Sequence, residues 1–214
     1  MHKIKPTIAV DLDEVLTAQN EAVRLFVNEV YNADFTPEDY MIEAPYWSYW
    51  ETIWGVDTKE GKQRLDKFIK SGGLMKQQPI PGAINAISKL EENYHLVIVT
   101  SRKDEHADNT NNWLRKHYPA VFKGVLFTAA WGDNASLMKA KVCREIGASY
   151  LIDDNYEHCE MVAGVGINAL LFGEYGWNVN KKLLKNITRV KNWKEVMEFF
   201  THTNFQSPNV RKET

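Results

Sequence analysis

The sequence predicts an α/β fold, in which helices flank an open parallel sheet and a small helical segment is inserted after the first strand. Short runs rich in Val, Ile and Leu recur along the 214 residues, as in strands that are buried on both faces of a parallel sheet. Amphipathic helical patterns separate these runs. Residues 17–81 contain helical patterns but no strand-like run, which predicts the insertion.

The predicted strands and helices alternate along the chain. The predicted strands are residues 7–12, 95–101, 124–128, 149–154 and 167–172. The predicted helices between them are residues 82–93, 106–118, 136–148 and 155–166. Strand followed by helix, repeated in this way, predicts a Rossmann-like open sheet with crossover helices.

The predicted domain organisation follows from the position of the insertion. We expect an α/β core made of residues 1–16 and 82–204, a helical cap at residues 17–81, and a frayed tail at residues 205–214. Ligands bind at the carboxyl edge of such sheets. A cap that follows the first strand directly is therefore expected to cover the ligand site.

The charge balance narrows the classes of partner. Lys plus Arg number 26 and Asp plus Glu number 28, which gives a net charge of −2. This balance predicts a small diffusible partner and no membrane or nucleic-acid polymer. The apolar run near the N-terminus is too short for the core of a signal peptide or for a membrane span, so we expect a cytoplasmic protein.

Acidic side chains follow two of the predicted strands. Asp11 and Asp13 end the first run, and Asp153 and Asp154 end the fourth. An Asp that caps the following helix would explain one of them, but not two pairs. If both strands are central, four carboxylates converge at one edge, which is costly without a counter-charge. Mg²⁺ prefers oxygen ligands and often binds phosphate substrates, so the pattern predicts a metal site.

Two other residue types support phosphate chemistry at the same edge. Thr100 ends the second predicted strand, where a hydroxyl can bind phosphate oxygens, although such a residue can also cap a helix. Lys139 and Lys141 lie on the predicted helix before the second acid pair. Either lysine could stabilise a phosphoryl group in transfer, and either could instead lie on a solvated helix face.

Four motifs in this order resemble the haloacid dehalogenase-like (HAD) superfamily of phosphotransferases. They are "DLDEVLT", "VIVTSR", "MKAKVCREIGA" and "YLIDDN". The resemblance implies that Asp11 is a nucleophile, that Asp13 is a general acid and base, and that Thr100 and Lys139 bind the phosphoryl group. It also implies a Mg²⁺ site; its ligands would be Asp11, the main-chain carbonyl of Asp13, and Asp153 or Asp154 or both.

Further motifs are similar to the 5'-nucleotidase branch of that superfamily, which is related to the 5'(3')-deoxyribonucleotidases. They include "PIPGAINAISKL", "TNNWLRKHYP" and "LLFGEYGWN". This resemblance implies a Mg²⁺-dependent phosphomonoesterase that acts on (deoxy)nucleoside monophosphates through an aspartyl-phosphate, and it leaves a homodimer open. Glu14 departs from the glycine of many relatives. The alternatives are a phosphatase of sugar phosphates or other small phosphoesters, and a non-catalytic module that binds a phosphate ligand.

The residues that select the substrate are less clearly marked. Ser101 and Arg102 directly follow Thr100 and are candidate phosphate contacts, although Arg102 could instead pair with Asp104. Trp47 and Trp50 lie in the aromatic segment of the cap and could stack on a base. The alternative for both rings is that they form the small core of the cap.

Overall fold

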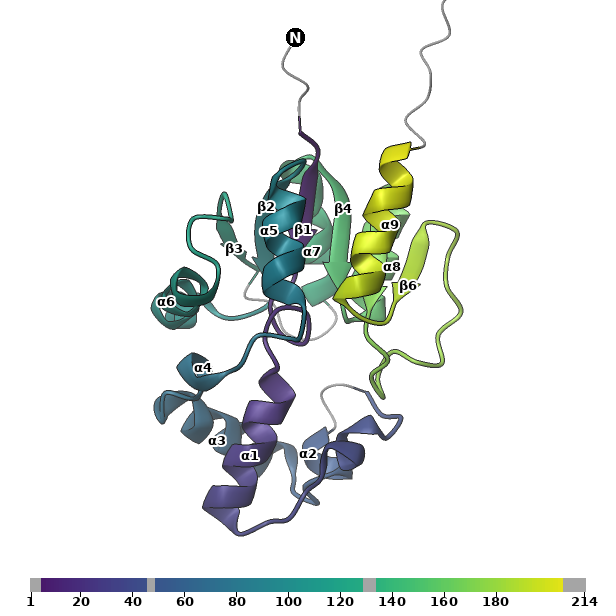
Figure 1. The fold of residues 1–214 in the computed structure, drawn as a ribbon. Helices are drawn as coiled ribbons and strands as arrows, with labels where there is room; N and C mark the ends of the chain where they lie inside the picture. Colours follow the sequence, from purple (N-terminus) through teal and green to yellow (C-terminus); the bar gives the residue numbers. More distant parts are fainter. Residues whose placement is uncertain (1–4, 46–48, 129–133, 206–214) are drawn as a thin grey trace, which may run out of the picture.

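The structure is a computed structural model that describes residues 5–45, 49–128 and 134–205 (Figure 1). Its strands are β1 (Thr7–Val10), β2 (His95–Thr100), β3 (Val125–Phe127), β4 (Ala148–Asp153), β5 (Asn168–Phe172) and β6 (Ile187–Val190). All five neighbouring pairs are parallel, in the order β3-β2-β1-β4-β5-β6. This confirms the predicted open parallel sheet, to which β6 adds a strand that was not predicted.

Helices cover both faces of the sheet. They are α5 (Ala83–Glu91), α6 (Ala107–His117), α7 (Asn134–Glu145), α8 (Tyr156–Gly164) and α9 (Trp193–Phe205), with the short 3-10 helix η3 (Asp104–His106) before α6. Ile8 and Val10 of β1 pack in the cluster that contains α5, α6 and α9, whereas Ala9 packs in the cluster of α7 and α8. Successive strand residues point to opposite faces, so β1 is buried on both sides.

The inserted segment, residues 17–81, is helical, and we call it the cap. It contains α1 (Gln19–Tyr31), η1 (Pro37–Met41), α2 (Tyr49–Thr52), α3 (Thr58–Lys70) and α4 (Gly73–Lys76). These helices enclose a hydrophobic cluster of their own, which includes Val27, Trp54 and Phe68. In Figure 1 they lie beyond the edge of the sheet where β1 ends.

Two adjacent chain segments join the cap to the sheet. Thr17 and Pro79 form an antiparallel bridge. The Ile80 N–H donates to the Leu16 carbonyl at 2.8 Å, and the Ala18 N–H donates to the Gln78 carbonyl at 2.9 Å. The entry and exit of the cap are therefore paired by backbone hydrogen bonds directly after β1.

Candidate active site

The candidate site lies where β1 and β4 end side by side. In the order β3-β2-β1-β4-β5-β6, the topological switch point falls between β1 and β4, and ligands bind at the carboxyl ends of the strands there. The backbone N–H of Asp11, the first residue after β1, donates to the Ile152 carbonyl at 2.9 Å. Pairing of the two strands thus continues to the point where the acids begin.

Three carboxylates converge at this point. Oxygen atoms of Asp11, Asp153 and Asp154 lie within 4.8 Å of one another, and all three residues are buried. The sequence predicted this convergence from the position of each acid at a strand end. Parallel strands bring their carboxyl ends to the same edge, so residues more than 140 positions apart become neighbours.

A single lysine is inserted into the cluster. Lys139 of α7 is fully buried, and its Nζ lies 2.9 Å from Oδ1 of Asp11 and 2.6 Å from Oδ2 of Asp153. Lys141, two residues further along α7, is exposed, and its Nζ lies 3.9 Å from Glu145. The structure therefore brings Lys139 to the acids and leaves Lys141 on the surface.

The site also contains a histidine that the sequence analysis missed. Nδ1 of His158 lies 3.1 and 3.2 Å from the two carboxylate oxygens of Asp153. His158 is in the first turn of α8, whose N-cap side chain, Asn155, accepts the His158 backbone N–H. Its position one turn after the acid pair was the available signal in the sequence.

Burial and charge set the pKa values of these acids. Burial raises the pKa of Asp11 to about 6, although Lys139 acts in the opposite direction. Burial and the neighbouring Asp153 raise the pKa of Asp154 well above its usual value. At Asp153 burial also acts to raise the pKa, but Lys139 and His158 outweigh it and lower the pKa. Among the described residues, full ionisation of all three carboxylates beside Lys139 and His158 would need a further counter-charge.

This donor set fits a hard divalent cation. Both oxygens of Asp153 are occupied, by Lys139, by His158 and by the Asn155 backbone N–H at 2.9 Å. In the described part of the chain, the Asp154 carboxylate has a hydrogen bond at Oδ2 only, from the Trp177 indole at 2.8 Å. Carboxylate oxygens are the ligands that Mg²⁺ prefers. Asp11 and Asp154 are therefore the residues best placed to ligate it directly.

Asp13 and Arg102 form an ion pair beside the cluster. Nε and Nη2 of Arg102 donate to the two Asp13 oxygens at 2.9 and 2.5 Å, and Thr17 donates to the same carboxylate at 3.0 Å. Arg102 also donates to Gln77 at 2.7 Å and to Thr110 at 3.2 Å. The guanidinium group thus binds Asp13, a candidate catalytic acid. Among the described residues its partner is not Asp104, and its donors are bound to protein groups and not left open for a substrate phosphate.

The turn after β2 offers hydroxyl groups and one unpaired donor. Thr100 is buried at the end of β2, and its Oγ1 accepts the Arg102 backbone N–H at 3.2 Å. Oγ of Ser101 is buried and has no hydrogen-bond partner within the described residues. A buried hydroxyl without a partner is costly, and a phosphate oxygen would satisfy it.

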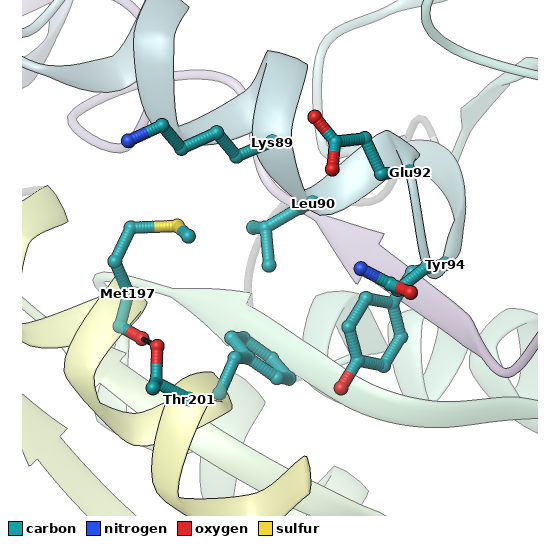
Figure 2. A pocket seen from close by; sticks show the side chains of 8 residues that line it. Lys89, Leu90, Glu92, Tyr94, Met197 and Thr201 are labelled. Carbon is teal, nitrogen blue, oxygen red and sulfur yellow. Dashed lines mark hydrogen bonds between the residues drawn. The ribbon is translucent and has the colours of Figure 1, made fainter.

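A cavity elsewhere in the molecule is separate from this site. It measures about 260 Å³ and lies between α5 and α9, with Leu90, Tyr94 and Met197 among its lining residues (Figure 2). Tyr94 directly precedes β2, so the cavity is at the amino edge of the sheet. The acids are at the opposite edge.

Comparison with known proteins identifies the family. The family model described as "5' nucleotidase, deoxy (Pyrimidine), cytosolic type C protein" matches residues 5–205. The chain belongs to this nucleotidase family. It is therefore a phosphoric monoester hydrolase, as the motifs at the strand ends predicted.

Individual relatives match most of the chain. A protein described as a 5'(3')-deoxyribonucleotidase of Clostridium acetobutylicum is 24% identical over 198 residues, which cover 89% of this chain and 92% of that protein. An uncharacterized 32.4 kDa protein of Enterobacteria phage T4 is 25% identical over 195 residues, which cover 90% and 69% of the two chains. The chain is thus similar to these proteins over most of its length.

Solved structures confirm the fold. A haloacid dehalogenase-like hydrolase from Streptococcus pneumoniae superposes with a TM-score of 0.67 at 15% identity, covering 92% of the present chain and 98% of the hydrolase. A HAD-hydrolase from Bacillus subtilis, solved with bound magnesium, gives a TM-score of 0.62 at 15% identity and covers 93% and 100%. Among the helices in the described part of the chain, none has both the length and the apolar composition that a membrane span requires.

Two of the predicted substrate contacts, Trp47 and Trp50, are tryptophans of the cap. Trp50 is only 5% exposed and lies in the hydrophobic cluster of the cap, where a Cβ at Gly61 would come within 2.5 Å of its ring. Its placement favours the packing interpretation over a base platform. Trp47 lies outside the described residues. No described contact tests the Asp13 carbonyl as a metal ligand, so that role stays a prediction.

Glu14 adopts a backbone conformation that is typical of glycine and has a structural use. Its φ is 56°, in the left-handed region where glycine is favoured. The N-cap of α1 is Ala18, which has no side-chain acceptor. The buried Glu14 carboxylate accepts the Asn20 backbone N–H at 2.6 Å instead, so Glu14 caps the first helix of the cap segment from the β1 loop.

Replacing Glu14 by Gln should change how stability depends on pH. Burial raises the Glu14 pKa to about 8, from an ordinary value of 4.5. The folded protein then binds this proton more tightly than the unfolded chain, so stability is present below about pH 4.5 and falls as the pH rises towards 8. Relative to Glu14→Gln, the native protein should lose roughly 1.4 kcal/mol per pH unit in this window.

Urea unfolding in EDTA at pH 5.5 and pH 8.0 measures this loss for both proteins. The difference between their free energies of unfolding isolates residue 14, because the other groups titrate in both. Unfolding free energies that change in parallel with pH would contradict the prediction.

Proposed function

We propose that the chain is a Mg²⁺-dependent nucleotidase that hydrolyses (deoxy)nucleoside monophosphates through an aspartyl-phosphate on Asp11. The observation that carries this proposal is Lys139, which is fully buried and ion-paired to both Asp11 and Asp153 at the switch point of the sheet. A module that only binds its ligand would not need a buried lysine that is paired to the candidate nucleophile as well as to Asp153. The family match and the name of the clostridial relative support the choice of nucleotides.

Each residue of the site has a role in this chemistry. Asp11 attacks the phosphorus atom, and a nucleophilic carboxylate divides one difficult hydrolysis into two easier steps. Lys139 orients Asp11 and offsets the charge of the phosphoryl oxygens. Ser101 and Thr100 hold phosphate oxygens at the end of β2. Bound Mg²⁺, held by Asp11 and Asp154, would supply Lewis-acid stabilisation of the phosphoryl oxygens.

Asp13 is the proposed general acid and base. In its protonated form the Asp13 carboxyl group donates its proton to the leaving alkoxide, and the carboxylate that results later accepts a proton from the attacking water. In the structure this carboxylate is bound by Arg102 and Thr17. We therefore assign Arg102 to the positioning of Asp13, and the substrate phosphate to Ser101 and the nearby backbone.

The cap at residues 17–81 is proposed to cover this edge during catalysis. Its entry segment, residues 16–18, follows Asp13 closely along the chain and is paired with the exit segment, residues 78–80. Arg102 also reaches Gln77, where the chain leaves α4. Arg102 therefore binds both the proposed general acid, Asp13, and the segment where the chain leaves the cap, at Gln77. We therefore expect the substrate leaving group to lie between the acid cluster and the cap.

Phosphate release from a substrate panel tests the proposal. The panel contains ribo- and deoxyribonucleoside 5'- and 3'-monophosphates and a set of sugar phosphates, each assayed with Mg²⁺ and with EDTA. We expect release that requires Mg²⁺ and is faster for nucleotides. Equal rates for sugar phosphates would reject the nucleotide assignment, and full activity in EDTA would reject the metal site.

A further inference from the structure

The loop between β5 and β6 lies against the acid cluster, although the sequence analysis gave it no chemistry. It spans residues 173–186, and its first part, residues 173–180, carries two aromatic rings, Tyr175 and Trp177. Their ring centroids are 4.7 Å apart and their planes differ by 7°. The two rings are therefore stacked face to face and form one aromatic unit.

This aromatic unit contacts the ends of both central strands. The indole N–H of Trp177 donates to Oδ2 of Asp154 at 2.8 Å. The hydroxyl of Tyr175 donates to the backbone carbonyl of Glu14 at 2.8 Å. One contact thus reaches a candidate metal ligand after β4, and the other reaches the turn after β1.

The loop is firmly attached to the sheet. Asn178 is fully buried, and its Nδ2 donates to the carbonyls of Asp154 at 2.8 Å and Phe172 at 3.0 Å. Arg189 of β6 donates to the carbonyls of Gly173 at 3.0 Å and Asn178 at 2.5 Å. Polar side chains therefore fix the position of the Trp177 ring relative to β4.

The outer side of the same loop touches the cap. Asn180 donates to Glu43 at 2.7 Å. A Cβ built at Gly176 would lie only 1.9 Å from the carbonyl oxygen of Ile42, so the two backbones are in direct contact. Trp177 also lines a narrow crevice with Ile42 and other cap residues.

We propose that Trp177 is a positioning residue that orients Asp154 for the divalent cation and couples metal binding to the seating of the cap. This proposal rests on the metal site of the proposed function. A hydrogen bond to a ligating carboxylate fixes its orientation, and the loss of such outer partners typically lowers metal affinity by about 10- to 100-fold. Because coupling is reciprocal, a seated cap should strengthen cation binding, and the cation should strengthen seating.

The first test removes only the indole donor. In Trp177→Phe an aromatic ring remains, but the N–H to Asp154 is lost, and Mg²⁺ affinity measured by titration calorimetry should fall by about 10- to 100-fold. The matched control is Tyr156→Phe, which removes a hydroxyl that bonds Glu160 and the Lys182 carbonyl on the surface of α8. The control should bind Mg²⁺ as the native protein does, and thermal melts in EDTA should show both variants folded.

The second test separates orientation from coupling. Gly176→Ala places a methyl group against the Ile42 carbonyl and leaves the indole in the chain. It should also weaken Mg²⁺ binding, although it touches no ligand. In the native protein Mg²⁺ should slow amide hydrogen exchange in residues 40–45, and Trp177→Phe should abolish that effect.

Each outcome has a distinct meaning. Native Mg²⁺ affinity in Trp177→Phe would overturn the positioning role. Native affinity in Gly176→Ala, or an unchanged exchange response in Trp177→Phe, would overturn the coupling. A native protein that binds no Mg²⁺ would instead reject the metal site of the proposed function.

Discussion

Asp11→Asn should abolish phosphate release while leaving the protein folded. Without a nucleophilic carboxylate no aspartyl-phosphate can form, and the loss of a nucleophile typically lowers turnover by roughly 10⁴- to 10⁶-fold. The amide oxygen can still accept the hydrogen bond from Lys139, which lies 2.9 Å from Asp11. The measurement is the turnover number with Mg²⁺ and the best substrate of the panel.

Stability distinguishes this loss from misfolding. Burial raises the pKa of Asp11 to about 6, so at pH 7.5 its ionised form makes the folded state less stable than an unperturbed carboxylate would. In EDTA the melting temperature of Asp11→Asn should therefore equal or exceed that of the native protein. Asp104→Asn, at an exposed position, is the matched control and should keep native turnover. Turnover of Asp11→Asn within tenfold of native would exclude the covalent route.

The sequence predicted the sheet and the acid cluster for one physical reason. Strands buried on both faces are almost continuously apolar, so the polar residues that end them are conspicuous. Val10 pairs with Ile152 in the register of β1 and β4. Asp11 and Asp153 follow these two residues and lie side by side in the structure. Their positions at the ends of two apolar runs were enough to predict this.

Strand β6 escaped the same analysis because it lies at the edge of the sheet. In Ile187–Val190 the first and last residues are buried, and the two between them, Thr188 and Arg189, are more exposed. One short strand with two polar residues has no long apolar run. Arg189 has a structural use here, since it holds residues 173–180 of the loop between β5 and β6 by their carbonyls.

Contacts between distant positions could not be predicted from local pattern. Arg102 binds Asp13 across 89 positions, and Tyr175 binds the Glu14 carbonyl across 161. A local interpretation gives Arg102 a phosphate or Asp104, because both are plausible neighbours of the turn after β2. The position of Arg102 depends on residues far away in the sequence. Where the chain leaves the cap, Gln77 lies beside Arg102 and accepts a hydrogen bond from it.

Lys139→Met should destabilise the folded protein by about 3–5 kcal/mol at pH 7.5 in EDTA, and it should abolish turnover. The ammonium group is fully buried between Asp11 and Asp153, and removal of one partner of a buried ion pair leaves uncompensated charge. Lys141→Met is the matched control on the same helix. Its lysine is exposed and 3.9 Å from Glu145, so its loss should change stability by less than about 1 kcal/mol.

The pH dependence of this difference identifies its cause. In the native protein burial acts to raise the pKa of Asp153, but Lys139 and His158 outweigh it and lower that pKa. The resulting stability is present above the ordinary value of 3.8 and is lost as the pH falls. Because Lys139 lowers the pKa of both Asp153 and Asp11, these acids take up protons at a higher pH in Lys139→Met, and the gap between the two proteins should narrow as the pH falls from 7.5. A gap that stays constant down to pH 3.5 would mean that the lysine stabilises the fold by packing its aliphatic stem and not by its charge.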